Sequence, residues 1–320
     1  MADQHADIVM APPFQALNDD QKDRIRKAAG SMSCLFVESK DIDSAATGAE
    51  IVACRYGHDL SFFSRTPRPK WVHCWSAGID EMAGPEVADS GVLLTCAKSN
   101  GAIALGEHVL MLMLMLQRNM LKWLENQRRH EWSKHPIGEL YGKTCGIIGL
   151  GYIGKETALR AKAFGMRTIG IKRNKEPVAN VDEIFDRSEL HKLLAESDFV
   201  VITAPHTLET DNMIDAAALA AMKQSAFIIL VSRGKIIDEE ALFSALKDGR
   251  IAGAGLDDFA IEPLPSSSPL WTAPNTIITP HNGPSSRETA DRGVEIFIDN
   301  LGRWQAGKEM RNIVDLAAGY

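Results

Sequence analysis

The sequence lacks any apolar run long enough to cross a membrane. Its most apolar stretch, VLMLMLML, covers only residues 109–116, whereas a membrane-spanning helix needs about 20 such residues. The opening residues, MADQHADIVM, lack the basic segment and apolar core of a secretion signal. We therefore expect a cytoplasmic protein with no membrane partner.

Cysteine is scarce, and its spacing excludes two common kinds of framework. The five cysteines form no CxxC pair and no spacing typical of a metal site. A disulfide scaffold or a structural zinc centre is therefore not expected. We expect reduced, mostly buried thiols and no metal at Cys34, Cys54, Cys74, Cys96 and Cys145.

An excess of basic residues is also missing. The 35 lysines and arginines are outnumbered by 42 acidic residues, giving a net charge of −7. This balance argues against nucleic acid or an anionic membrane as a partner. The 320 residues, 45% of them hydrophobic, suffice for one large or two ordinary domains.

Short apolar runs alternate with helix-compatible stretches along the chain. This rhythm predicts βαβ units with parallel sheets, in two doubly wound α/β units that meet near residues 100–105. Residues 106–129 predict one helix of about 25 residues, with a very apolar first half. The expected strands lie in DIVMA, CLFVE, EIVACR, WVHCWSAG, VLLTCA, KTCGIIG, RTIGIKR, FVVITAP, AFIILVS, IAGAGLDDF and NTIITPH.

A glycine motif follows one of these strands and opens a helix. In CGIIGLGYIGKETA, the glycines Gly149, Gly151 and Gly154 form G-x-G-x-x-G. The first permits a tight turn, the second lets a pyrophosphate approach the backbone, and the third lets helix and strand pack closely. The helix N-terminus adds free N–H groups and a positive dipole end, so the motif predicts dinucleotide binding.

No carboxylate ends the next strand. RTIGI is followed by Lys172, Arg173 and Asn174. An acid there would bind the ribose hydroxyls of NAD, whereas a guanidinium can grip the 2′-phosphate of NADP. The pair therefore favours NADP(H), with NAD as the second cofactor, although a basic pair that only enters solvent is the simpler alternative.

Three later strands end near polar side chains, namely Arg233, Glu262 and His281. Singly, each could be a surface or loop residue. Together they meet the needs of 2-oxo acid reduction, because a cation can bind the carboxylate and polarise the carbonyl. A histidine can supply a proton, and a carboxylate can keep that histidine protonated. The hydride would come from a nicotinamide.

In this order, the motifs resemble the D-isomer-specific 2-hydroxyacid dehydrogenase family over nearly the whole chain. The basic pair is similar to that of NADP-preferring members such as glyoxylate/hydroxypyruvate reductases. The matching segments are GKTCGIIGLGYIGKETA, VSRGKIIDEEAL, GAGLDDFAIEPLP, NTIITPHNG, SAGIDEM and LGEHVLMLMLML.

The resemblance implies a substrate-binding domain of residues 1–102 and 283–320, flavodoxin-like and completed by the C-terminal helix. It implies a Rossmann cofactor domain of residues 103–282, a cleft between the two, and a homodimer paired through the cofactor domain. The substrate would be a small 2-oxo or 2-hydroxy acid.

The resemblance also assigns roles to individual residues. Arg233, Glu262 and His281 would be catalytic. Ser76, Ala77 and Gly78 would bind the substrate carboxylate together with Arg233 and His281. The expected cofactor contacts are Gly149, Gly151, Tyr152, Ile153, Gly154, Lys172, Arg173, Asn174, Thr203, Ala204, Pro205, Val231, Ser232, Asp257 and His281.

Two departures from the family pattern are visible. Asp258 stands where an apolar residue is usual, and Ser232 stands where the family varies; neither is expected to be catalytic. The substrate side chain would contact residues from 54–60, from the helix around Trp123 and from the stretch after His281.

Two other classes share this scaffold. One is a dinucleotide-sensing corepressor, against which the complete Arg233, Glu262 and His281 set argues. The other is a formate or phosphite dehydrogenase. Formate enzymes of this scaffold carry Gln in place of the glutamate, so Glu262 argues against that activity.

Overall fold

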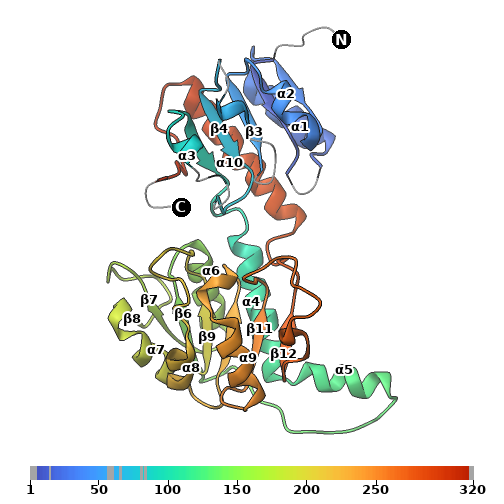
Figure 1. Ribbon diagram of the computed structural model, residues 1–320, viewed down its shortest axis with the longest axis vertical. Coiled ribbons are helices and arrows are strands. Elements are labelled where there is room, and N and C mark those ends of the chain that lie inside the picture. Colours follow the sequence, from blue (N-terminus) through green and yellow to red (C-terminus); the bar gives the residue numbers. More distant parts are fainter. Residues whose placement is uncertain are drawn as a thin grey trace. The chain divides into compact units, whose positions relative to one another are not determined.

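The computed structural model describes residues 6–13, 16–55, 61–64, 67–79, 82 and 85–316. The chain divides into two compact units (Figure 1). Unit 1 comprises Met1–Gly101 and Ser285–Tyr320, and unit 2 comprises Ala102–Pro284.

Unit 1 is built on a five-stranded parallel sheet of order β2-β1-β3-β4-β5. This order is that of flavodoxin-like folds. The strands are β1 (Ile8–Met10), β2 (Cys34–Phe36), β3 (Ile51–Cys54), β4 (Trp71–Cys74) and β5 (Leu93–Cys96). The helices are α1 (Asp19–Ala29), α2 (Ile42–Ala45), α3 (Pro85–Ala88) and α10 (Arg287–Gln305).

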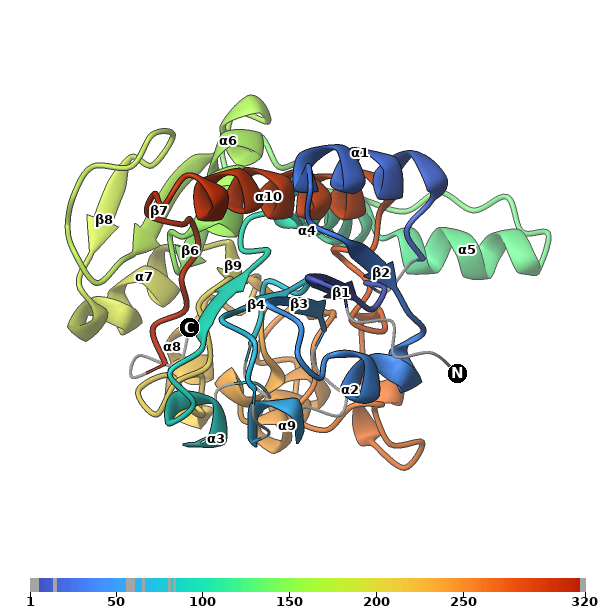
Figure 2. The same cartoon turned by 90° about the horizontal axis from the view of Figure 1, so that it is seen from above.

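The C-terminal helix α10 completes unit 1 by packing beside α1 (Figure 2). Gln21 of α1 donates a hydrogen bond to Asp291 of α10 at 2.7 Å. Beneath the two helices, Phe297 of α10 stacks on Trp71 of β4 inside an apolar cluster. The first and last segments of the chain therefore share one core.

Unit 2 contains a seven-stranded parallel sheet of order β12-β11-β10-β9-β6-β7-β8, with apolar clusters on both faces. The strands are β6 (Thr144–Ile148), β7 (Arg167–Ile171), β8 (Glu183–Phe185), β9 (Phe199–Ile202), β10 (Phe227–Leu230), β11 (Gly253–Leu256) and β12 (Thr276–Ile278). The helices are α4 (Ala102–Gln117), α5 (Met120–Arg128), α6 (Tyr152–Ala163), α7 (Leu190–Glu196), α8 (Ala216–Ala221) and α9 (Glu239–Lys247).

The strand order of unit 2 reverses between β6 and β9, as in dinucleotide-binding sheets. Ligands of such sheets bind at the carboxyl ends of the strands beside this reversal. The predicted fold class, two doubly wound parallel-sheet units, is confirmed. Strand β8 was not predicted, because it has three residues and only Phe185 is buried.

The prediction of one long helix over residues 106–129 is wrong. Helix α4 ends at Gln117, and α5 begins at Met120. Between them Asn119 has a φ of 53°, a left-handed conformation that asparagine tolerates better than most residues. A tertiary contact fixes the break, because the N–H of Gly138 donates to the carbonyl of Gln117 at 3.1 Å.

All five cysteines are thiols rather than disulfides, and four of them are buried, as the sequence predicted. In the described ranges, none of the helices combines the length and apolar character needed to span a bilayer.

Candidate active site

The glycine turn joins β6 to α6 and is closely packed. Gly149 has a φ of 99°, and a Cβ there would lie 2.6 Å from the backbone nitrogen of Ala204. A Cβ on Gly154 would lie 2.2 Å from the carbonyl oxygen of Gly149. At Gly151, the N-cap of α6, a Cβ would meet nothing within 4 Å. Open space therefore lies in front of the helix N-terminus, which suits a bound phosphate.

The basic pair lies beside this turn. The backbone N–H of Gly149 donates to the carbonyl of Ile171, the last residue of β7, at 3.1 Å. Lys172 is half-buried, and its Nζ lies 3.5 Å from Oε2 of Glu176. Arg173 and the following Asn174 are exposed. Both cations thus follow a strand that is hydrogen-bonded to the first glycine of the motif.

A third segment of the expected cofactor site follows β9. Thr203 and Ala204 are buried, and Pro205 is exposed. The Thr203 hydroxyl donates to the carbonyl of Gly149 at 2.5 Å, joining this loop to the glycine turn. The glycine turn, the basic pair and the β9 loop therefore gather at one edge of the sheet, with Tyr152 and Ile153 in the first turn of α6.

Arg233, Glu262 and His281 follow three neighbouring strands, β10, β11 and β12. Because parallel strands end at one edge of a sheet, the three residues lie at the edge that also carries the glycine turn. Arg233 follows the buried Val231 and Ser232, which are expected cofactor contacts. It directly precedes the short 3-10 turn Gly234–Ile236.

His281 and Glu262 form a hydrogen-bonded pair. Nδ1 of His281 lies 2.7 Å from Oε2 of Glu262, and the other oxygen of Glu262 accepts the N–H of Phe259 at 2.9 Å. Burial would lower the pKa of His281, but the negative charges of Asp258 and Glu262 outweigh it and raise that pKa. The arrangement favours an imidazolium that can donate a proton.

Asp257 anchors the loop that carries His281. Its side chain is fully buried, and Oδ1 accepts the Thr279 hydroxyl at 2.5 Å and the N–H of Asn282 at 3.0 Å. Oδ2 accepts the N–H of Gly283 at 2.9 Å. Both carboxylate oxygens therefore have partners within the protein, which gives Asp257 a structural role in addition to its expected contact with the cofactor.

Sequence reasoning missed the groups that support this loop. Besides Thr279, they include His108 of α4, whose Nε2 lies 3.0 Å from the Thr279 hydroxyl. The position of Thr279 at the end of β12 was an available signal, because strand ends line the ligand edge. Nothing in the sequence pairs His108 with a residue that lies 171 positions away.

Sequence reasoning also set aside Asp258, which is only 3% exposed. Its Oδ1 lies 3.4 Å from Nε2 of His281. Burial raises the pKa of Asp258 to about 7. The nearest donor atoms of Asp258, Glu262 and His281 lie within 4.8 Å of one another, a spacing that could also hold a cation.

The expected carboxylate-binding residues belong to unit 1. Ser76, Ala77 and Gly78 follow β4, whose last residue is Cys74. Residues 80 and 81 of the SAGIDEM motif lie outside the described residues, as do residues 56–60 of the expected substrate pocket.

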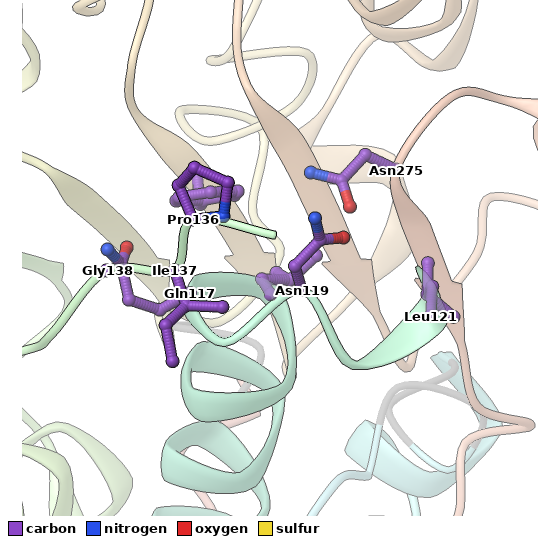
Figure 3. Close-up of a pocket in the computed structure, with 9 residues that line it drawn as sticks. Gln117, Asn119, Leu121, Pro136, Ile137, Gly138 and Asn275 are labelled. Carbon is purple, nitrogen blue, oxygen red and sulfur yellow. The ribbon is translucent and has the colours of Figure 1, made fainter. Parts of the chain in front are cut away.

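A groove of about 590 Å³ lies at the other end of the sheet in unit 2 (Figure 3). It is lined by Phe227, the first residue of β10, and by Asn275, which directly precedes β12. Gln117 and Asn119, from the break between α4 and α5, also line it. The groove is therefore at the amino ends of the strands, at the opposite end of the sheet from Arg233, Glu262 and His281.

Comparison with known proteins agrees with this geometry. Residues 110–283 match the family model of the D-isomer specific 2-hydroxyacid dehydrogenase NAD binding domain. The chain is 34% identical to glyoxylate reductase from Pyrococcus furiosus, over 86% of this chain and 82% of that protein. It is 33% identical to glyoxylate/hydroxypyruvate reductase B from Pectobacterium carotovorum, over 94% and 96% respectively.

A solved D-isomer specific 2-hydroxyacid dehydrogenase from Xanthobacter autotrophicus, in complex with NADPH and MES, has a similar fold. Its TM-score is 0.85 at 27% identity, covering 98% of this chain and 100% of that one. The chain therefore belongs to the D-isomer-specific 2-hydroxyacid dehydrogenase family. It is an oxidoreductase that uses a nicotinamide cofactor.

Proposed function

We propose that this protein is an NADPH-preferring reductase of small 2-oxo acids of the glyoxylate or hydroxypyruvate kind. The observation that carries the proposal is the hydrogen-bonded pair of His281 and Glu262, at the sheet edge shared by Arg233 and the glycine turn. The names of the two reductase relatives support the substrate class.

In the proposed mechanism, Arg233 binds the substrate carboxylate and polarises the carbonyl group. Glu262 holds Nδ1 of His281, so that Nε2 is the nitrogen that donates a proton to the carbonyl oxygen. The nicotinamide, when bound, supplies the hydride to the carbonyl carbon. Backbone amides at Ala77 and Gly78 would hold the substrate carboxylate.

The glycine turn fits a dinucleotide. Neither Gly149 nor Gly154 has room for a side chain, and open space lies next to Gly151. The proposed preference for NADPH rests on Lys172 and Arg173. They follow the strand after which an acidic residue would bind the ribose hydroxyls of NAD. The guanidinium of Arg173 would bind the 2′-phosphate. The NADPH complex of the Xanthobacter relative supports this choice.

The first experiment measures reduction of a panel of 2-oxo acids, including glyoxylate, hydroxypyruvate and pyruvate, with NADPH and with NADH. We expect the two-carbon and three-carbon acids to be reduced and NADPH to give the higher kcat/KM. Absence of turnover with the whole panel would contradict the proposed function.

The cofactor assignment is tested by Lys172→Asp combined with Arg173→Ile. Loss of a charged hydrogen bond costs about 1.5–3 kcal/mol, so the NADPH/NADH ratio of kcat/KM should fall by roughly 10- to 100-fold. The matched control is Lys192→Asp, which removes an exposed lysine from α7 in the same unit. If the ratio stays the same in the double variant, the pair does not select the cofactor.

A corepressor-like or formate-type function has less support. Relatives that are 33–34% identical to this chain include glyoxylate reductase, glyoxylate/hydroxypyruvate reductase B and glycerate dehydrogenase. Glu262 occupies the position at which formate enzymes of this scaffold carry glutamine. No feature of the described residues favours either alternative.

A further inference from the structure

Asp258 places a second carboxyl group against the proposed proton donor, and this one is buried, whereas Glu262 is exposed. Its Oδ1 lies 3.4 Å from Nε2 of His281, while Glu262 contacts Nδ1 at 2.7 Å. The imidazole ring therefore lies between two acids. Nε2 is the nitrogen that has to release the proton, because Glu262 holds the other one.

We propose that Asp258 is a positioning residue for His281: its carboxyl group, 3.4 Å from Nε2, holds the proton at that nitrogen while Glu262 holds Nδ1. The kinetic part of this proposal rests on the proposed reductase function. The ionisation of His281 itself can be measured without turnover.

Of the charged groups that face Asp258 and His281, some raise the pKa values of these two side chains and others lower them. Asp258 is faced by His281, Asp257, Arg233 and Glu262. Burial raises the pKa of Asp258 to about 7, and the neighbouring acids add to this effect, whereas the two cationic groups oppose it. For His281, burial and the Arg233 guanidinium lower the pKa, and the carboxylates of Asp258 and Glu262 raise it. Together, the two acids outweigh burial and the neighbouring guanidinium.

These charges predict in which direction the loss of Asp258 would shift the pKa of His281. As pH rises through about 7, Asp258 ionises, and its negative charge then favours the imidazolium. Reduction of an oxo acid needs the imidazolium, whereas oxidation of the hydroxy acid needs the neutral ring. Without Asp258, the pKa of His281 should therefore fall, and both pH profiles should move to lower pH. An opposite charge within about 4–6 Å typically changes a pKa by about one to three units.

The test compares Asp258→Asn, which keeps the shape of the side chain, with Asp258→Val, which restores the apolar residue usual at this position. Profiles of kcat/KM against pH are recorded in both reaction directions. In both variants the alkaline limb of reduction and the acidic limb of oxidation should shift to lower pH by about one unit. Profiles that superimpose on those of the unmodified protein would overturn the proposal.

The matched control is Asp215→Asn in the same unit. Asp215 is the N-cap of α8 and accepts the N–H of Ala218. Asparagine caps a helix as well as aspartate does, so this variant should fold and keep the original profiles. A shift of equal size in the control would show that the effect is not specific to Asp258, and would overturn the proposal.

A ¹⁵N-edited NMR titration of His281 separates this proposal from the proposed function. In the cofactor-free protein, the pKa of His281 should fall in both Asp258 variants and stay unchanged in the Asp215 variant. If the unmodified protein reduces no 2-oxo acid, the proposed function fails, but the titration still decides the role of Asp258. An unchanged His281 pKa in both Asp258 variants would show that Asp258 does not hold the proton.

Discussion

At the scale of single residues, the site depends on a histidine whose surroundings are unusually acidic. His281 has a φ of 50°, a region that few non-glycine residues occupy, and its backbone N–H donates to the carbonyl of Asp257 at 2.8 Å. Its ring then meets Glu262 on one side and Asp258 on the other. Backbone conformation and two carboxyl groups together determine where its proton is held.

We expect His281→Gln to reduce kcat for 2-oxo acid reduction by about 10²- to 10⁴-fold, the usual contribution of a general acid. NADPH affinity, measured by fluorescence titration, should change little because most of the expected cofactor contacts lie at the glycine turn and the β9 loop, and His281 is only one of them. The control is His206→Gln, a histidine paired with Asp211 on the same unit. Loss of NADPH binding in the His281 variant would instead point to a structural role for this residue.

At the scale of elements, the position of Arg233 depends on the chain segment that follows it. A 3-10 turn, Gly234–Ile236, connects Arg233 to α9, and Asp238 caps that helix. One oxygen of Asp238 accepts the N–H groups of Glu240 and Ala241, both at 3.0 Å. The turn and the cap therefore fix the chain immediately after the proposed substrate-binding cation.

Asp238→Ala removes this cap and should lower the free energy of unfolding by about 1 kcal/mol. The control, Asp248→Ala, makes the same change at the C-terminal end of α9, where an exposed acid is unfavourable for the helix dipole. Urea unfolding followed by circular dichroism should show a lower midpoint for the first variant only. Equal midpoints would mean that the cap does not contribute.

At the scale of the whole molecule, unit 2 leaves apolar side chains exposed on two helices that pack together. Ile103 and Met111 are 38% and 40% exposed on α4, and Leu159 is 49% exposed on α6. Gly106 of α4 lies close against α6, and a Cβ at this position would lie 3.0 Å from the Cβ of Glu156. The absence of a side chain at Gly106 therefore allows the two helices to pack closely. We propose that a second copy of this chain covers this surface, which agrees with the expected homodimer.

Sedimentation velocity tests this proposal. The unmodified protein should sediment as a dimer, and Met111→Glu combined with Leu159→Glu should give a monomer, because buried charges without partners are costly. Leu208→Glu is the control, since Leu208 is fully exposed after β9. A monomeric unmodified protein would contradict the proposal.

The sequence by itself determined the class of fold and the chemistry of the expected site. Apolar runs at regular intervals specify buried parallel strands, since a strand covered on both faces must be apolar throughout. Gly149 and Gly154 of the turn can also be predicted from the sequence, because only glycine fits where a Cβ would meet backbone atoms within 3 Å. The likeness to a family then assigned Arg233, Glu262 and His281 from their motifs.

Only the tertiary structure decided what contacts distant parts of the chain make. The helix break at Asn119 involves a hydrogen bond from Gly138, which local helical periodicity cannot report. Asp258 looked unimportant in the sequence because ionisation depends on burial and neighbouring charges, and both arise only when β11 and β12 lie side by side. Local pattern specifies elements, whereas the electrostatics of a site depends on residues that folding brings together.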